Sequence, residues 1–327
     1  MGEVCLVPPD VACCLGQRQV LLRPKPDVDP RYLHIALQSP FVRHQILWSE
    51  GTGSTVSNIR IPVLEAIRIP RMGRAESHIA AIIGALDDKI ELNRRMNETL
   101  EASARALFRD WFVDFGPTRA KAEGRPAYLA PDLWSLFPDR LGDDGLPEGW
   151  PLVAVRDHLE LKYGKSLPAR DRTAGAFPVY GSGGQSGTHC EAIVRGPAVI
   201  VGRKGTVGSL FWEDRDCYPI DTAFYVAPKL SLAFCYELLA AFPLRDMNTD
   251  AAVPGLNREN VYRLELANPP TELIVAFDGL AREIRARMSC NDAESRTLAE
   301  TRDALLPKLM SGAIRVREQA ARAEALL

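Results

Sequence analysis

The sequence of 327 residues has no long hydrophobic run, no cysteine motif and no excess of charge of either sign. No stretch approaches the ~18 uncharged apolar residues of a membrane span, and Met1–Val4 does not begin a signal peptide. The seven cysteines are an odd number without a C-x-x-C pair, and the five histidines are scattered. These absences predict a cytoplasmic protein with free thiols, no membrane association and no metal site.

The charges are balanced overall but sorted along the chain. The 40 basic and 42 acidic side chains give a net charge of −2, which does not suggest a nucleic-acid-binding protein. Residues 161–210, however, carry seven basic and two acidic side chains, whereas residues 76–115 carry five basic and eight acidic ones. The segment 161–210 is therefore a candidate nucleic-acid surface despite the neutral total.

The chain contains an internal repeat, and each copy ends in a long helical pattern. Core-type positions step by four and three from Ile79 to Trp111 and again from Leu273 to Leu305, which is typical of a coiled-coil seam. Both seams become polar in the middle, at Asn93 and Asn97 in the first and at Arg287, Asn291 and Glu294 in the second. Asn93 and Asn291 share the offset of 198 that relates the two helices. The pattern predicts two long packed helices whose register is defined but whose direction, parallel or antiparallel, stays open.

The regions before the helices also correspond. Val20–Lys25 and Phe224–Lys229 are predicted β-rich runs, and a helical segment follows each of them at Tyr32–Leu37 and Phe234–Leu239. Strand-like runs come next, at Ile59–Pro62 and Val261–Leu264. The second copy also contains Trp150–Arg203, about 55 residues that have no counterpart in the first copy.

A basic turn in the second copy is the main candidate for ligand contact. Val199–Val201 is predicted to be a buried strand that leads directly into Arg203 and Lys204 between glycines, where an arginine can reach a phosphate or a guanine edge. Lys165, Arg170 and Arg172 lie on another predicted loop. Weaker candidates flank or lie in the Gly181–Gly187 run: Tyr180, Ser182 and His189. In the first copy the corresponding groove-facing loop would carry Ser54, Thr55, Asn58 and Arg60.

No catalytic motif is complete. Gly181–Gly187 lacks the third glycine of a dinucleotide-binding loop, and no phosphate-binding G-x-x-x-x-G-K-[ST] occurs. Asn268-Pro269-Pro270 lacks the aromatic residue that adenine methyltransferases have next, and Asp87-Asp88-Lys89 lies on the helical pattern without an upstream acidic partner. The sequence predicts a binding protein without an active site of its own.

Several motifs along the chain resemble those of the specificity subunits of type I restriction–modification systems. Leu146-Pro147-Glu148-Gly149-Trp150 is similar to the start of a target-recognition domain in that family. Leu86–Ile90, the Gly202–Gly208 turn, Asp221–Val226 and the closing Leu305–Gly312 also resemble it, as does the repeat itself.

The resemblance implies an α+β fold with two β-rich target-recognition domains, the first incomplete, joined by two long antiparallel helices. The expected parts are a partial first recognition domain (1–75), a first spacer helix (76–116), a linker (117–145), a second recognition domain (146–270), a second spacer helix (271–312) and a charged tail (313–327). It implies sequence-specific recognition of a bipartite site in double-stranded DNA, as part of a defence against foreign DNA. The implied partners are methylation subunits and restriction subunits, which would hold the S-adenosylmethionine, ATP and magnesium; this chain would hold no cofactor.

Two alternatives belong to other classes of protein. A coiled-coil scaffold would bind only protein and have no DNA specificity. A truncated, non-functional specificity subunit would behave in the same way. A stand-alone enzyme would methylate or cleave nucleic acid as the purified chain.

Overall fold

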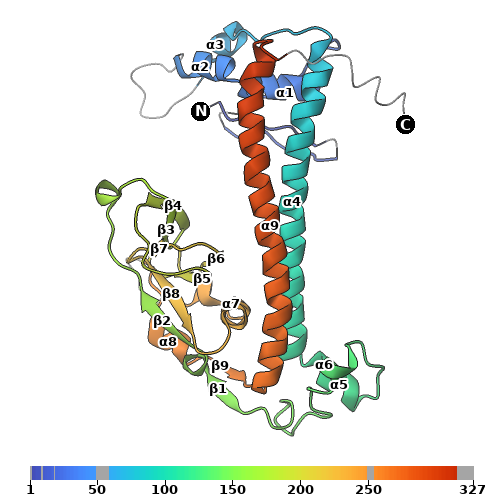
Figure 1. Ribbon diagram of the computed structural model, residues 1–327, viewed down its shortest axis with the longest axis vertical. Coiled ribbons are helices and arrows are strands. Elements are labelled where there is room, and N and C mark those ends of the chain that lie inside the picture. The colour runs from blue at the N-terminus through green and yellow to red at the C-terminus, as the bar shows by residue number, and fades with distance from the viewer. Residues whose placement is uncertain (1, 9, 18, 49–58, 249–253, 315–327) are drawn as a thin grey trace. The chain divides into compact units, whose positions relative to one another are not determined.

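The computed structural model describes residues 2–8, 10–17, 19–48, 59–248 and 254–314 (Figure 1). The chain divides into two compact units, one of Met1–Met96 with Cys290–Leu327 and one of Asn97–Ser289. Two long helices, α4 (Ala75–Phe112) and α9 (Thr271–Met310), contribute to both units. None of the helices in the described part of the chain is long and apolar enough to cross a membrane.

The two long helices pair in the antiparallel direction. In the first unit the Asn93 side-chain amide donates hydrogen bonds to Asn291 O at 3.3 Å and to Glu294 Oε2 at 2.8 Å. In the second unit the Asn97 side chain donates to Met288 O at 3.3 Å. The partners of the two asparagines run in opposite directions along the two helices, as the family resemblance implies. The mixed helix and sheet class with two long helices is confirmed.

The predicted seam is correct for α4 and partly wrong for α9. Ile79, Ile83 and Trp111 are buried as predicted. On α9, however, Arg287, Glu294 and Thr301 are exposed, and Met288, Ser295 and Arg302 are the more buried residues in their place. Exposure avoids the free-energy cost of burying Arg287 or Glu294 without full pairing. Arg302, the charged residue that is more buried, is paired with Asp87 at 2.8 Å.

The described residues of the first 75 form helices and no strand: α1 (Pro30–Gln38), α2 (Pro40–Trp48) and α3 (Ile61–Ala66). The helix predicted at Tyr32–Leu37 is confirmed, with Asp29 as its N-cap. The strand predicted at Ile59–Pro62 is wrong, because Ile61-Pro62 begins α3, and proline fits the first turn of a helix. The core of this unit contains Tyr32, Ile35, Ile79 and Ile83 together with Leu306 and Leu309.

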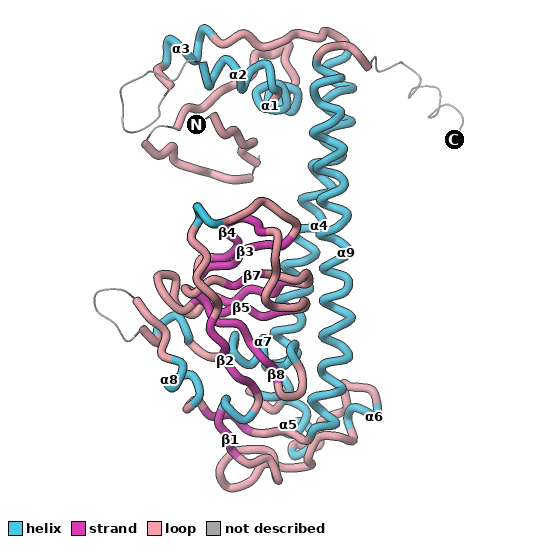
Figure 2. Tube along the Cα trace, turned by 60° about the vertical axis from the view of Figure 1, so that its left-hand side comes forward, coloured by secondary structure: helices cyan, strands magenta, loops and turns pink. Residues whose placement is uncertain are grey.

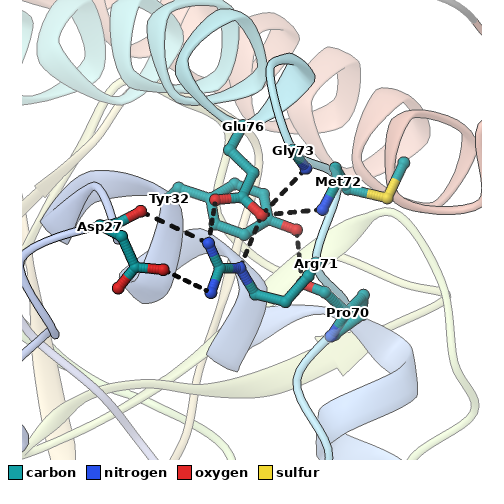
Figure 3. Close-up of polar contacts among 7 residues, drawn as sticks. All are labelled: Asp27, Tyr32, Pro70, Arg71, Met72, Gly73 and Glu76. Atoms are coloured by element: carbon teal, nitrogen blue, oxygen red, sulfur yellow. Dashed lines mark hydrogen bonds and ion pairs between the residues drawn. The ribbon is translucent and has the colours of Figure 1, made fainter.

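A buried carboxylate closes the start of α4. Glu76 Oε1 accepts hydrogen bonds from the backbone N–H groups of Met72 (2.8 Å) and Gly73 (3.2 Å) and from Arg71 Nε (2.8 Å) (Figure 3). Arg71 also reaches Asp27. These bonds fix the backbone of Met72 and Gly73 immediately before the first turn of α4.

The second unit contains the sheets (Figures 1 and 2). A four-stranded antiparallel sheet has the order β2-β8-β5-β6, a three-stranded sheet has the order β4-β3-β7, and β1 pairs with β9. The strands are β1 (Leu152–Ala154), β2 (Leu159–Tyr163), β3 (Phe177–Gly181), β4 (Gly184–His189), β5 (Ala198–Gly202), β6 (Leu210–Glu213), β7 (Tyr218–Pro219), β8 (Ala223–Pro228) and β9 (Glu265–Ala267). All five residues of β5 are buried, which confirms the buried strand predicted before Arg203.

The pairing of β8 explains why its repeat-related segment is not a strand. β8 bonds to β2 on one side and to β5 on the other, and both partners lie in the stretch of the second copy that has no counterpart in the first. The β-rich run predicted at Val20–Lys25 forms no strand, since isolated extended segments are not stable without pairing. Sequence similarity to a strand was therefore an insufficient signal.

Helix α7 (Leu232–Ala241) joins the four-stranded sheet to the long helices in this unit. It contacts β5, β6 and β8, and Phe234 packs against Phe108 and Phe112 of α4 and Phe277 of α9 at ring-centre distances of 5.2 to 6.4 Å. The Ser231 hydroxyl caps α7 by accepting from Phe234 N and donates to Asp278 of α9. The four-stranded sheet is therefore fixed to this end of the helices by an aromatic core. The short helix α8 (Arg258–Tyr262) occupies the place of the strand predicted at Val261–Leu264, which is wrong.

The segment between α4 and β1 is more ordered than its composition predicts. α4 stops at Phe112, and α5 (Gly116–Ala122) begins at Gly116. Together with α6 (Pro131–Trp134), this segment buries Phe137 against Trp111 at a ring-centre distance of 5.3 Å. Besides its many proline, glycine and charged residues, this segment contributes a small set of side chains to the core.

Candidate nucleic-acid interface

The Gly202–Gly208 turn after β5 is held in place by three neighbouring segments. Arg203 N and Lys204 N both donate to Thr222 O, and Leu256 N donates to Arg203 O at 2.8 Å. The Ser209 hydroxyl donates to Ser182 O. A Cβ at Gly202 would collide with Thr206 O and Ser209 Oγ, so this turn requires glycine there. The fixed backbone gives the side chains of the turn defined starting points.

Arg203 lies half-buried on an aromatic surface. Its guanidinium carbon is 4.8 Å from the ring centre of Tyr163 and 5.7 Å from that of Phe224, and its Nη1 donates to Asp221 O at 2.8 Å. Stacking on a ring leaves the in-plane N–H groups of a guanidinium available for further acceptors.

Three other predicted cations are exposed to solvent. Lys204 follows Arg203, with its backbone bridged to Gly255. Lys165 follows β2, and its backbone N–H is fixed by Pro219 O. Arg170 lies in the short 3-10 helix η2 (Ala169–Asp171), with its side chain 86% exposed. Such side chains are free to reach a ligand.

Arg172 and Ser182 have structural roles in the same region. Arg172 Nη1 donates to Ser186 O at 2.8 Å and its Nε to Leu167 O at 3.3 Å, which ties the η2 loop to β4. Ser182 takes part through its backbone, since its N–H donates to Thr222 Oγ1. Both residues support loops that carry the exposed cations.

Tyr180 and His189 are buried rather than presented at the surface. The Tyr180 hydroxyl donates to Glu213 Oε2 at 2.9 Å, and burial together with this carboxylate raises the pKa of Tyr180. Burial also raises the pKa of Glu213, but hydrogen bonds from Arg215 outweigh it and the pKa lies below its ordinary value. His189 Nδ1 accepts from Thr173 N, and its ring packs edge-on to Tyr218. The sequence gave no indication that Tyr180 and His189, which are polar residues beside a glycine run, are buried.

The candidates of the first copy are mostly outside the described residues, where Ser54, Thr55 and Asn58 lie. Arg60 is described: it is exposed and occupies the N-cap position of α3.

Two residues of the second copy were missed in the sequence. Tyr163 carries Arg203, and Arg258 lies over the same ring with its guanidinium carbon 5.3 Å from the ring centre. Arg258 is the first residue of α8, with Asn257 as its N-cap, and its local sequence does not indicate the ring over which it lies.

Within the described part of the chain, no group of three or more histidine, cysteine, aspartate or glutamate side chains could hold a metal ion. The chemistry that the site offers is hydrogen-bond donation by cationic side chains.

Two curated proteins and one solved structure are similar to this chain. No family model matches the chain. The chain is 26% identical over 311 residues to the type I restriction enzyme HindI specificity subunit of Haemophilus influenzae, covering 73% of this chain and 67% of that protein. It is 23% identical over 354 residues to the MjaIX specificity subunit of Methanocaldococcus jannaschii, covering 97% and 76%.

The fold also matches a solved structure, that of the type I restriction–modification S subunit from M. genitalium. The TM-score is 0.54 at 18% sequence identity, over 86% of this chain and 73% of that one. The chain is similar to type I restriction enzyme specificity subunits, as its motifs indicate. This relationship is consistent with DNA sequence recognition and does not favour the coiled-coil scaffold.

Proposed function

We propose that this chain is the DNA-recognition subunit of a type I methyltransferase and restriction complex, and that it performs no catalysis itself. The observation that carries the proposal is the clustering of cations on fixed loops at one sheet. Arg203 and Lys204 follow the buried strand β5. Lys165 follows β2, and β8 lies between β2 and β5 in the same sheet.

The proposed contacts divide into two kinds. The exposed cations Lys165, Arg170 and Lys204 bind phosphates, which supplies affinity without sequence information. Arg203, which lies over an aromatic ring, reaches either a phosphate or the O6 and N7 atoms of guanine. Arg172, Tyr180, Ser182 and His189 support these loops, whereas Ser54, Thr55, Asn58 and Arg60 are the corresponding proposal for the first recognition domain.

The proposed partners are two kinds of subunit. Methylation subunits bind the long helices, whose segment 76–115 carries an excess of acidic side chains, and restriction subunits join for cleavage. S-adenosylmethionine, ATP and magnesium belong to those subunits. The domain boundaries given above, with the recognition domains at 1–75 and 146–270, are part of the proposal.

The test is DNA retention by the complex of this chain with the methylation subunits from its own locus. Methylation-site mapping against a deletion strain would identify the methylated motif. We expect Arg203→Ala with Lys204→Ala to abolish retention of duplex DNA that carries this motif. Arg125→Ala with Arg140→Ala is the matched control, because it removes two exposed arginines of the same unit whose ion pairs lie elsewhere. Assembly with the methylation subunits without any DNA retention would support a scaffold instead. Methylation or cleavage by the purified chain alone would establish an enzyme.

A further inference from the structure

A basic pocket lies beside β2 and α8, which are neighbours in both views (Figures 1 and 2). Its volume is about 270 Å³, and the side chains that matter in its lining are Tyr163, Arg203, Lys204, Asn257, Arg258 and Glu259. They come from the end of β2, from the turn after β5 and from the start of α8. The pocket therefore joins the basic turn to a segment about 50 residues further along the chain.

Two guanidinium groups share one aromatic ring in this pocket. Both guanidinium carbons lie within 5.3 Å of the Tyr163 ring centre, so they are no more than twice that distance apart. Each also lies over a second ring, Arg203 over Phe224 and Arg258 over Tyr262. This stacking fixes the orientation of the two groups without using their N–H donors.

Arg258 has an unused buried donor. Its Nε is buried and has no hydrogen-bond partner among the residues that the structure describes. The nearest carboxylate oxygen, Glu259 Oε1, is 3.8 Å away, which is too far for a hydrogen bond. Its Nη1 is 3.5 Å from Leu161 O, at the limit of such a bond. A buried charged donor without an acceptor is costly. The Arg258 side chain is 33% exposed, so its guanidinium can interact with an acceptor in the pocket through its other N–H groups.

The balance of charge in the pocket favours an anion. The lining contains three cationic side chains, those of Arg203, Lys204 and Arg258, and one carboxylate, that of Glu259. The Glu259 side chain is half-exposed and is also 3.8 Å from Arg156. The Tyr163 ring, which is 50% exposed, already lies against Arg203 and Arg258, with Phe224 at a ring-centre distance of 5.0 Å. The donors suit tetrahedral oxygens better than a flat base.

We propose that this pocket binds one phosphate group of the DNA backbone, with Arg203, Lys204 and Arg258 as its donors and Tyr163 as their support. The proposal rests on the proposed function, and it adds Arg258 and Tyr163 to the interface. A phosphate held by fixed donors would set the position of the duplex on the recognition domain, and sequence would be read by other side chains.

The test uses Arg258→Gln in the complex with the methylation subunits. We expect binding to weaken about tenfold, equally for duplex DNA with the mapped motif and for a scrambled duplex. The slope of log K against log salt concentration should decrease by about 1. Arg258→Lys, which keeps the charge but not the fork, should restore part of the affinity.

Arg156→Gln is the matched control. Arg156 lies 5.8 Å from the Tyr262 ring centre and 3.8 Å from Glu259, like Arg258, but it does not line the pocket. We expect it to leave affinity and salt slope unchanged. Equal melting temperatures of the free chain with and without each change would show that both variants fold.

The outcomes separate this proposal from the proposed function. If the wild-type complex binds its motif specifically and Arg258→Gln binds it equally well with the same salt slope, the pocket proposal is refuted and the function stands. A loss confined to the motif duplex would mean a base contact, which also refutes it. Stabilisation of the free chain by pyrophosphate, lost in Arg258→Gln while DNA binding is unchanged, would identify a site for free phosphates and overturn the proposal. If the wild-type complex shows no specific binding, the proposed function fails first.

Discussion

Replacing Glu237 with glutamine tests whether one buried carboxyl makes the stability of the second unit depend on pH. Glu237 lies on α7 with 2% of its side chain exposed, and Arg285 of α9 approaches its Oε1 to 3.3 Å. Arg285 is itself held over the rings of Tyr236 and Trp212, at 4.4 and 4.8 Å from their centres. Glu237 Oε2 is buried without a hydrogen-bond partner among the described residues.

Burial raises the pKa of Glu237 to about 7 from an ordinary value of 4.5, although Arg285 opposes the shift. The folded protein therefore keeps a proton that the unfolded chain releases at lower pH. This contribution to stability is fully present below the unfolded pKa and is lost as pH rises through the folded pKa. At ~1.4 kcal/mol per pKa unit, the free energy of unfolding should fall by up to ~3 kcal/mol between about pH 4.5 and about pH 7.

The assay is urea unfolding of the full chain at several pH values from about 5 to about 8, followed by tryptophan fluorescence. Glu237→Gln cannot ionise, so the difference in stability between wild type and variant should shift in favour of the variant as the pH rises. Glu191→Gln, at an exposed position after β4, is the control and should follow the wild type at every pH. A wild-type-to-variant difference that stays constant across this range would refute the reasoning.

Three other changes have defined outcomes. Phe277→Ala should lower the free energy of unfolding, measured in urea, by ~3–5 kcal/mol, because removal of this fully buried ring leaves a cavity between α4, α7 and α9. Val275→Ala, at a 56% exposed site, is the control and should change it by less than ~0.5 kcal/mol. Gly202→Ala should displace the basic turn and reduce DNA retention by the complex, while Gly183→Ala, whose added Cβ would be 3.6 Å from its nearest neighbour, should retain DNA normally. Asn93→Ala should cost ~1–3 kcal/mol in urea unfolding, because its amide bonds to the facing helix are lost; an unchanged urea midpoint would contradict this role.

The recognition region shows which parts of a site a sequence can predict. The buried strand before Arg203 was predictable, because an unbroken apolar run between glycines is typical of a central strand, and β5 is buried at every residue. The exposed positions of Lys165, Arg170 and Lys204 follow from their charge. What the sequence could not supply was the pairing of distant side chains. Tyr180 and Glu213 are 33 residues apart and meet only through the sheets.

The same limit explains Arg258 and the strands of the first copy. Arg258 becomes part of the interface because α8 returns next to β2, and nothing in its local sequence shows that neighbour. Val20–Lys25 has the composition of its relative β8 but not the neighbours β2 and β5. Strand formation depends on partners from elsewhere in the chain, so local composition alone predicts it poorly.

The middle of the helix pair is where the repeat itself determines contacts. In an antiparallel pair built from two copies of one helix, equivalent residues can face each other only at the midpoint, and Asn93 and Asn291 do so. Lys89 precedes Asn93 by one turn and pairs with Glu294, which follows Asn291, whereas Asn97 follows Asn93 by one turn and bonds to Met288, which precedes Asn291. A constant offset between the copies, together with an antiparallel direction, allows equivalent residues to meet at one level only, and Asn93 and Asn291 mark that level. Polar side chains at this midpoint make that register specific, because a shift of either helix would leave buried amide groups without partners.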